Sequence, residues 1–170
     1  IIAQSKGADR IELNNAIHLG GLTPSLASLI LAKEQVEIPI ITMLRARPGG
    51  FFYNEEELET MYLDAKLFIE HGADGIVFGF LNDDASIDIE NTKKFVDLAH
   101  ENNVEAIFHR AFDRANDPIQ EIEDLIECGV DRVLTSGQMS SADLGIDLLA
   151  KLNADYGDKI GFCVGAGVRS

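Results

Sequence analysis

The feature that most constrains the fold is a short motif that occurs three times along the chain. Its copies are Gly7-Ala8-Asp9, Gly72-Ala73-Asp74 and Gly129-Val130-Asp131. Each copy follows a helical pattern and leads into an apolar run rich in β-branched residues. The glycine suits the left-handed conformation that ends a helix, and the aspartate suits the tight turn that comes next. The motif therefore predicts a repeated helix–turn–strand unit.

Three further apolar runs, at residues 39–44, 104–108 and 160–164, bring the predicted strands to six. Strands this apolar that alternate with helices favour a parallel sheet covered by helices. No Gly-x-Gly-x-x-Gly or Walker-type loop is present, and the repeated start favours a closed (β/α)8 TIM barrel over an open doubly wound sheet. Such barrels typically need about 250 residues. We therefore expect a single domain over residues 1–170, an incomplete barrel with about six of eight units, lacking the first strand and the last unit.

Several helix boundaries carry clear sequence signals. Thr23-Pro24 and Asp117-Pro118 each resemble an N-cap followed by proline at the first helical position. Asn54 with Glu57 matches a capping box, and residues 1–6 resemble the end of a helix. The acidic residues Glu121, Glu123 and Asp124 are interpreted as a solvated face or as charges at a helix N-terminus.

Composition excludes some classes of function. Fourteen basic against 29 acidic residues give a net charge of −15, which disfavours binding to nucleic acid and to anionic lipid. No apolar run approaches the roughly 20 residues of a membrane span. Cys128 and Cys163 are the only cysteines, so no disulfide framework is indicated and we expect a cytoplasmic location.

Polar residues gather where predicted strands end, which is the edge of a parallel α/β sheet where ligands and catalytic groups lie. His109, Arg110 and Asp113 follow one strand, and Arg45 and Arg47 follow another. His109 could act as a general acid or base or as a metal ligand, or it could simply satisfy a backbone carbonyl. Both arginines could hold one carboxylate or phosphate, with solvation at the surface as the alternative.

Other residues complete the predicted site. Glu12 lies between apolar neighbours and should point inward, either as a base or metal ligand beside His109 or in an ion pair with Arg45. Ser136-Gly137 and Gly165 follow two later strands, where glycines let backbone N–H groups approach an anion. No Cys-x-x-Cys or His-x-x-x-His is present, so no dedicated metal site can be assigned.

Taken in order along the chain, these segments resemble the CutC family of copper-homeostasis proteins. The segments that carry the resemblance are residues 7–13, 20–25, 45–51, 72–79, 108–113 and 134–138. The resemblance implies a (β/α)8 barrel, a copper-related role and self-association into an oligomer. Three positions depart from the family pattern: Asn14 stands where a cysteine is common, Gly50 where an aspartate is common, and Ala166 within a usual triple glycine. Loss of that cysteine removes a thiolate suited to Cu(I).

Three hypotheses follow. The first is a CutC-like cytoplasmic barrel whose polar pocket binds a small anionic molecule, with Glu12 and His109 as catalytic residues and, as substrate-binding residues, Arg45, Arg47, Arg110, Asp113, Ser136, Gly137 and Gly165. In this reading the alternative to a copper role is a TIM-barrel enzyme doing acid/base chemistry on a phosphorylated or carboxylated metabolite. The second is a non-catalytic copper-handling protein, and the third is a scaffold with a vestigial site.

Overall fold

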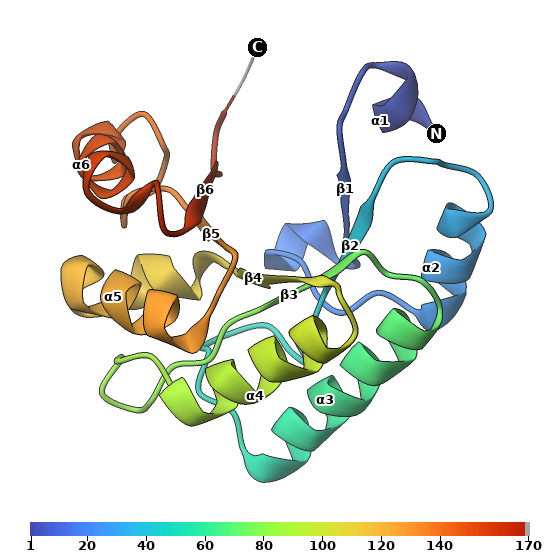
Figure 1. The fold of residues 1–170 in the computed structure, drawn as a ribbon, viewed down its shortest axis with the longest axis horizontal. Helices are drawn as coiled ribbons and strands as arrows, with labels where there is room; N and C mark the ends of the chain where they lie inside the picture. Colours follow the sequence, from blue (N-terminus) through green and yellow to red (C-terminus); the bar gives the residue numbers. More distant parts are fainter. Residues whose placement is uncertain (169–170) are drawn as a thin grey trace. The chain divides into compact units, whose positions relative to one another are not determined.

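The computed structural model describes residues 1–168, and the chain divides into two compact units. Unit 1 comprises residues 1–78 and 97–105, and unit 2 comprises the rest of the described chain. Helix α4 (Ile89–Glu101) and strand β4 (Glu105–Phe108) contribute residues to both units. Figure 1 shows strands and helices alternating along the whole chain.

All six predicted strands are present. The order across the sheet is β1-β2-β3-β4-β5-β6, so each strand follows its predecessor in the chain. Every intervening connection carries a helix, as parallel pairing of successive strands requires. This is the α/β class that the repeated motif predicts.

Unit 1 holds strands β1 (Ile11–Leu13), β2 (Ile40–Met43) and β3 (Gly75–Phe78). They pair in parallel, with Glu12 opposite Ile41 and Thr42 opposite Ile76. The helices are α1 (Ile2–Ser5), the 3-10 turn η1 (Ile17–Leu19), α2 (Leu26–Lys33) and α3 (Glu55–Glu70). Helices α2 and α3 lie side by side (Figure 1). The apolar core of the unit includes Leu29, Ile40, Met61, Phe68 and Ile76, all fully buried.

Unit 2 holds most of β4 together with β5 (Arg132–Thr135) and β6 (Gly161–Val164). Val133 of β5 lies opposite Phe108 on one side and Phe162 on the other, both pairings parallel. The helical elements are η2 (Arg110–Arg114), α5 (Pro118–Cys128) and α6 (Ile146–Tyr156), with the first part of α4. The Phe80 and Phe95 rings lie 4.8 Å apart in its core.

In two of its three copies, the Gly-x-Asp motif uses its aspartate to hold the preceding strand. Asp74, just before β3, accepts a hydrogen bond from the Ile40 backbone N–H at the start of β2 (2.7 Å). Asp131, just before β5, accepts one from the Ala106 N–H in β4 (2.8 Å). The motif therefore stabilises the amino ends of the strands, opposite the end where the polar residues gather.

Most predicted helix boundaries are confirmed. Asp117 caps α5 with proline at the first position, and Asn54 with Glu57 forms a capping box on α3. The Thr23 cap is wrong, because Ser25 caps α2 and accepts from the Ser28 N–H. The Thr23 hydroxyl instead accepts the Arg45 backbone N–H (2.9 Å). Glu121 lies in the first turn of α5, as the helix N-terminal alternative predicts, but it is not solvated, since it is 4% exposed.

Candidate functional site

In unit 2, the Asp113 carboxylate organises the polar segments that follow β4 and β5. Its side chain is 5% exposed. Its Oδ1 accepts from the Thr135 hydroxyl (2.6 Å) and the Gln138 N–H (3.2 Å), and its Oδ2 accepts from Arg110 Nε (2.7 Å) and the Ser136 hydroxyl (2.8 Å). Burial alone would raise the pKa of Asp113, but these donors outweigh it and the pKa is lowered. Asp113 is therefore a fixed anion inside the unit.

The turn at residues 135–138 has a backbone shape that only a few residues tolerate. Gly137 has φ +69° and Gln138 has φ +57°, both in the left-handed region. A Cβ on Gly137 would lie 2.3 Å from the Gly145 carbonyl oxygen, so glycine is required there. Backbone N–H groups of Ser136 and Gln138 point at Asp113. The backbone N–H groups of Ser136 and Gln138 therefore hold the protein's own Asp113 carboxylate, while the Gly137 N–H donates to the Thr135 hydroxyl.

Arg110 is fixed by this cluster and still reaches solvent. Its Nε donates to Asp113 and its Nη2 donates to the Ser136 hydroxyl (3.0 Å), while the side chain stays 42% exposed. Within residues 1–168, Nη1 makes no hydrogen bond. The stem lies beside Gly165, where a Cβ would come 4.0 Å from Arg110 Cδ. The guanidinium is therefore preorganised, with one edge turned away from its protein partners.

His109 is 3% exposed at the end of β4. Its Nδ1 accepts the Ala111 backbone N–H (3.1 Å), which places the proton of the neutral imidazole on Nε2. The ring fits against Gly79, because a Cβ there would lie 2.4 Å from ring atoms Nδ1 and Cε1. The geometry therefore makes His109 a hydrogen-bond donor through Nε2.

In unit 1, Arg45 is buried at the end of β2, with 7% exposure. Its Nη1 donates to the carbonyl oxygens of Leu19 and Gly21, and its Nη2 to that of Gly49, each at 3.1 Å. Its guanidinium also lies over the Phe51 ring, 5.1 Å from the centroid. Backbone carbonyls, rather than a carboxylate, surround this cation.

Arg47 forms an ion pair with Glu57. Its Nε donates to Glu57 at 2.5 Å, and Nη2 donates to the Phe52 carbonyl at 2.7 Å. The Arg47 hydrogen bond lowers the pKa of Glu57. The guanidinium also covers the Tyr53 ring. Burial raises the pKa of the Tyr53 hydroxyl, and the neighbouring Arg45 and Arg47 charges oppose that shift.

Glu12, in the middle of β1, is half-buried and accepts the Asn14 side-chain N–H at 2.7 Å. Glu12 and Arg45 form no ion pair in the part of the chain that the structure describes. The predicted residues therefore fall into two groups. Unit 1 carries Glu12, Arg45 and Arg47, and unit 2 carries the remainder.

Sequence reasoning gave no role to Gly79, which makes room for His109. It also missed the hydrogen bonds that Thr135 and Gln138 donate to Asp113 and that Asn14 donates to Glu12. A glycine just past the end of β3 was the one available signal for Gly79. Thr135 and Gln138 are ordinary polar residues whose partner, Asp113, is distant in sequence.

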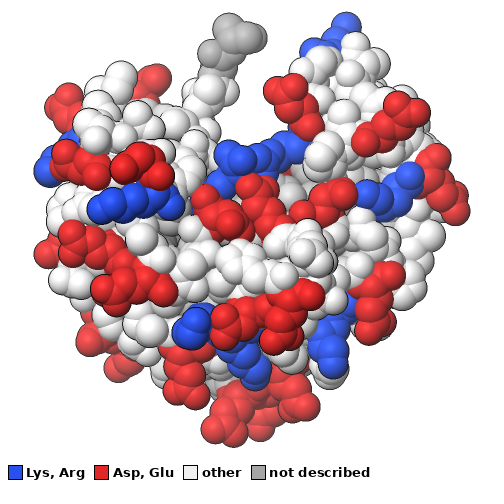
Figure 2. Space-filling view, viewed as in Figure 1, with Lys and Arg blue, Asp and Glu red and all other residues white. Residues whose placement is uncertain are grey.

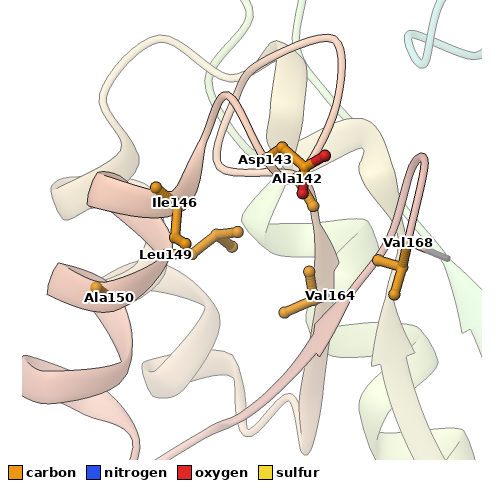
Figure 3. Close-up of a pocket in the computed structure, with 7 residues that line it drawn as sticks. All are labelled: Ala142, Asp143, Ile146, Leu149, Ala150, Val164 and Val168. Atoms are coloured by element: carbon orange, nitrogen blue, oxygen red, sulfur yellow. The ribbon is translucent and has the colours of Figure 1, made fainter. Parts of the chain in front are cut away.

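An apolar pocket of about 420 Å³ lies in unit 2 between α6 and β6 (Figure 3). Ile146, Leu149 and Ala150 of α6 line it opposite Val164 of β6, with Asp143 at one side. None of the predicted site residues lines this pocket.

Acidic side chains outnumber basic ones on the face shown in Figure 2.

Comparison with known proteins places the chain in a family. A model of the CutC family matches residues 1–170. The chain belongs to the CutC family. A CutC family protein of Treponema denticola is 44% identical over 168 residues, which cover 99% of this chain and 68% of the relative. The chain thus spans about two thirds of the length of the curated CutC relatives it matches.

Solved structures agree on the fold. The crystal structure of the putative copper homeostasis protein CutC of Streptococcus agalactiae matches with a TM-score of 0.88 at 29% identity, covering 94% of this chain and 79% of that one. Deoxyribose phosphate aldolase from Aeropyrum pernix matches with a TM-score of 0.63 at 17% identity, over 85% of this chain and 62% of the aldolase. The second likeness shows a fold shared with TIM-barrel proteins.

The copper that the family name implies can be tested against the donor atoms present. In residues 1–168, no three His, Cys, Asp or Glu side chains lie close enough together to hold a metal ion. Cys128 is buried at the end of α5, its thiol directed at the Ile89 carbonyl, and Cys163 lies half-buried in β6. The donors in this CutC chain therefore do not fit a copper–thiolate centre.

Across residues 1–168, no helix is long and apolar enough to cross a bilayer.

Proposed function

We propose that this CutC-family protein is a cytoplasmic protein that binds a small anionic molecule at the carboxyl ends of β4 and β5. Arg110 is the anchor. The observation that carries the proposal is its geometry: two of its nitrogens are fixed by Asp113 and Ser136, and the side chain remains 42% exposed. A guanidinium held in this way loses little conformational freedom when it binds a carboxylate or phosphate.

His109 gives the site chemistry beyond binding. Its Nδ1 is engaged by the Ala111 N–H, so the imidazole is neutral and presents its proton at Nε2. An imidazole in this tautomer can polarise a carbonyl of a bound ligand by donating a hydrogen bond from Nε2. We propose acid/base chemistry on a small phosphorylated or carboxylated metabolite as the activity of the site, with Ser136 and Gly165 beside the anchor.

Copper handling is the second proposal, and it rests on the names of relatives. The solved structure with the greatest likeness reported above is described as a putative copper homeostasis protein. The side chains of this chain do not add support, since no three-donor cluster is present among the described residues.

A thermal-shift survey of the full-length protein tests the proposal. Phosphorylated and carboxylated metabolites are compared with Cu(I) under reducing conditions. An anion at 100 times its dissociation constant adds about 2.7 kcal/mol of stability, which raises the unfolding temperature by about 5 °C or more. Stabilisation by an anion supports the proposal. Stabilisation by Cu(I) alone, with no anion effective, overturns it in favour of copper handling.

A further inference from the structure

Arg45 in unit 1 is a buried cation without a carboxylate partner. It is 7% exposed, and its neighbours are three backbone carbonyls, the Phe51 ring and the Tyr53 hydroxyl. Burying a charge is costly unless an opposite charge or strong hydrogen bonds compensate it. The carbonyls of Leu19 and Gly21 provide much of that compensation, and both belong to one loop.

That loop, residues 15–22, folds back on itself above the ends of β1 and β2. The Asn15 and Leu22 backbones pair with each other, at 2.9 and 2.8 Å. Between them, Gly20 and Gly21 have φ of +90° and +86°. A Cβ on Gly20 would lie 3.0 Å from Arg45 Nη1, and a Cβ on Gly21 would lie 2.5 Å from Asn14 Oδ1. The two glycines let loop 15–22 lie directly against Arg45 and Asn14.

Two buried polar atoms beside this loop have no hydrogen-bond partner within residues 1–168. They are Arg45 Nε, a donor, and Asn14 Oδ1, an acceptor. Buried polar atoms are normally satisfied, and each exception calls for an explanation. Asn14 Nδ2 is bound to Glu12, which sets the orientation of the amide and turns Oδ1 the other way. Arg45 Nε is a donor on a charged group and Asn14 Oδ1 is a neutral acceptor, and both lie beneath loop 15–22.

Loop 15–22 is also weakly anchored. Two of its three large apolar side chains, Ile17 and Leu19, are 69% and 43% exposed, and the third, Leu22, is half-buried. Ala16 has φ +48°, a backbone conformation that alanine disfavours. Segments with few buried apolar contacts open at low cost in free energy.

We propose that loop 15–22 is the cover of an internal binding site, and that its ligand is a small phosphate or carboxylate that also carries a hydroxyl group. Arg45 binds the anionic group in place of the Leu19 and Gly21 carbonyls. Asn14 Oδ1 accepts the hydroxyl proton. This site is built from unit 1 alone and does not depend on the Arg110 site of unit 2.

The test compares two probes, glycerol 3-phosphate and inorganic phosphate, by calorimetry on the full-length protein. Glycerol 3-phosphate binds at least 10-fold more tightly than phosphate if Asn14 accepts its hydroxyl. Arg45→Met weakens both probes at least 10-fold, whereas Asn14→Ala removes only the preference for glycerol 3-phosphate. Lys66→Met, which removes a positive charge from an exposed position in the same unit, leaves both constants unchanged.

Amide hydrogen exchange gives an independent readout. Saturating glycerol 3-phosphate changes exchange within residues 15–22, in wild type and in Lys66→Met. The inference is overturned if neither probe binds, if a folded Arg45→Met binds as wild type does, or if exchange in the loop does not respond. If Arg45→Met does not fold, two other results decide: whether Asn14→Ala removes the preference for glycerol 3-phosphate, and whether glycerol 3-phosphate changes amide exchange within residues 15–22. Binding that is lost in Arg110→Gln but kept in Arg45→Met supports the unit 2 site and overturns this one.

Discussion

Arg110 donates through Nε to the carboxylate of Asp113 at 2.7 Å, three residues along the same 3-10 turn. The pair is asymmetric, since the carboxylate is 5% exposed and the guanidinium side chain is 42% exposed. Asp113 is thus the buried fixed point, and Arg110 is the part of the pair that a ligand can reach. The same carboxylate fixes the turn after β5, so one residue positions both segments of the proposed site.

Replacing Asp113 with Asn should destabilise unit 2. The variant loses charged hydrogen bonds with Arg110, Thr135 and Ser136, at a cost of about 2–3 kcal/mol near neutral pH. Because the folded pKa is lowered, the contribution of the carboxylate is present above the unfolded pKa near 4 and is lost as pH falls through the folded value. Urea unfolding of wild type and variant at several pH values measures this difference.

The matched control for that experiment is Asp158→Asn, which changes an exposed aspartate. Its stability should stay within about 0.5 kcal/mol of wild type. A difference between Asp113→Asn and wild type that does not shrink on acidification would contradict the account.

A methyl group at Gly79 should disturb His109. Its carbon would lie 2.4 Å from the ring and 2.9 Å from the Ala111 side chain, so Gly79→Ala should cost about 1–3 kcal/mol through overpacking. Gly50→Ala is the control, because a Cβ there meets nothing within 4 Å. Equal unfolding free energies for the two variants would show that the His109 ring is not held against Gly79.

Glu121 should shape the pH dependence in the opposite sense from Asp113. Burial raises its pKa, and the Ile87 N–H that it accepts at 2.8 Å only partly opposes the shift. Its contribution is therefore complete below the unfolded pKa of about 4.3 and falls as pH rises through the folded value. Glu121→Gln keeps an acceptor for Ile87 without the charge. We expect its stability relative to wild type to increase from pH 4 to pH 7, measured by denaturant unfolding; a constant difference would be evidence against a buried ionising group.

The repeated motif offers a comparison within one protein. Asp74 holds the Ile40 N–H and Lys33, whereas Asp9 is exposed and makes no hydrogen bond in the described chain. Asp74→Ala should cost about 1 kcal/mol or more, and Asp9→Ala less than about 0.5 kcal/mol. Equilibrium unfolding of both variants measures this, and a reversed order would refute the structural role of the motif.

Local signals explain why the architecture could be predicted from sequence. The apolar runs, the repeated Gly-x-Asp and the caps at Asn54 and Asp117 each act over a few residues. The Thr23 cap failed for the opposite reason. Thr23 and Ser25 both flank Pro24, and a hydrogen bond to Arg45, 22 residues away, decides between them.

The candidate site could be predicted in its residue types but not in its pairings. Arg45 and Arg47 are two residues apart, yet one is enclosed by carbonyls of loop 15–22 and Gly49, and the other pairs with Glu57. Asp113 gathers donors up to 25 residues away because the ends of β4 and β5 lie at one edge. Such contacts depend on strand register, which no local pattern in this chain encodes.

The most direct test of the central claim is calorimetric titration of the anion found in the thermal-shift survey into wild type, Arg110→Gln and Arg114→Gln. Arg114 is an exposed arginine at the end of the same 3-10 turn and serves as the charge control. The account predicts a dissociation constant raised at least 10-fold in Arg110→Gln, equivalent to about 1.4 kcal/mol or more, and unchanged in Arg114→Gln. Equal affinity in all three proteins would contradict an anion site anchored on Arg110.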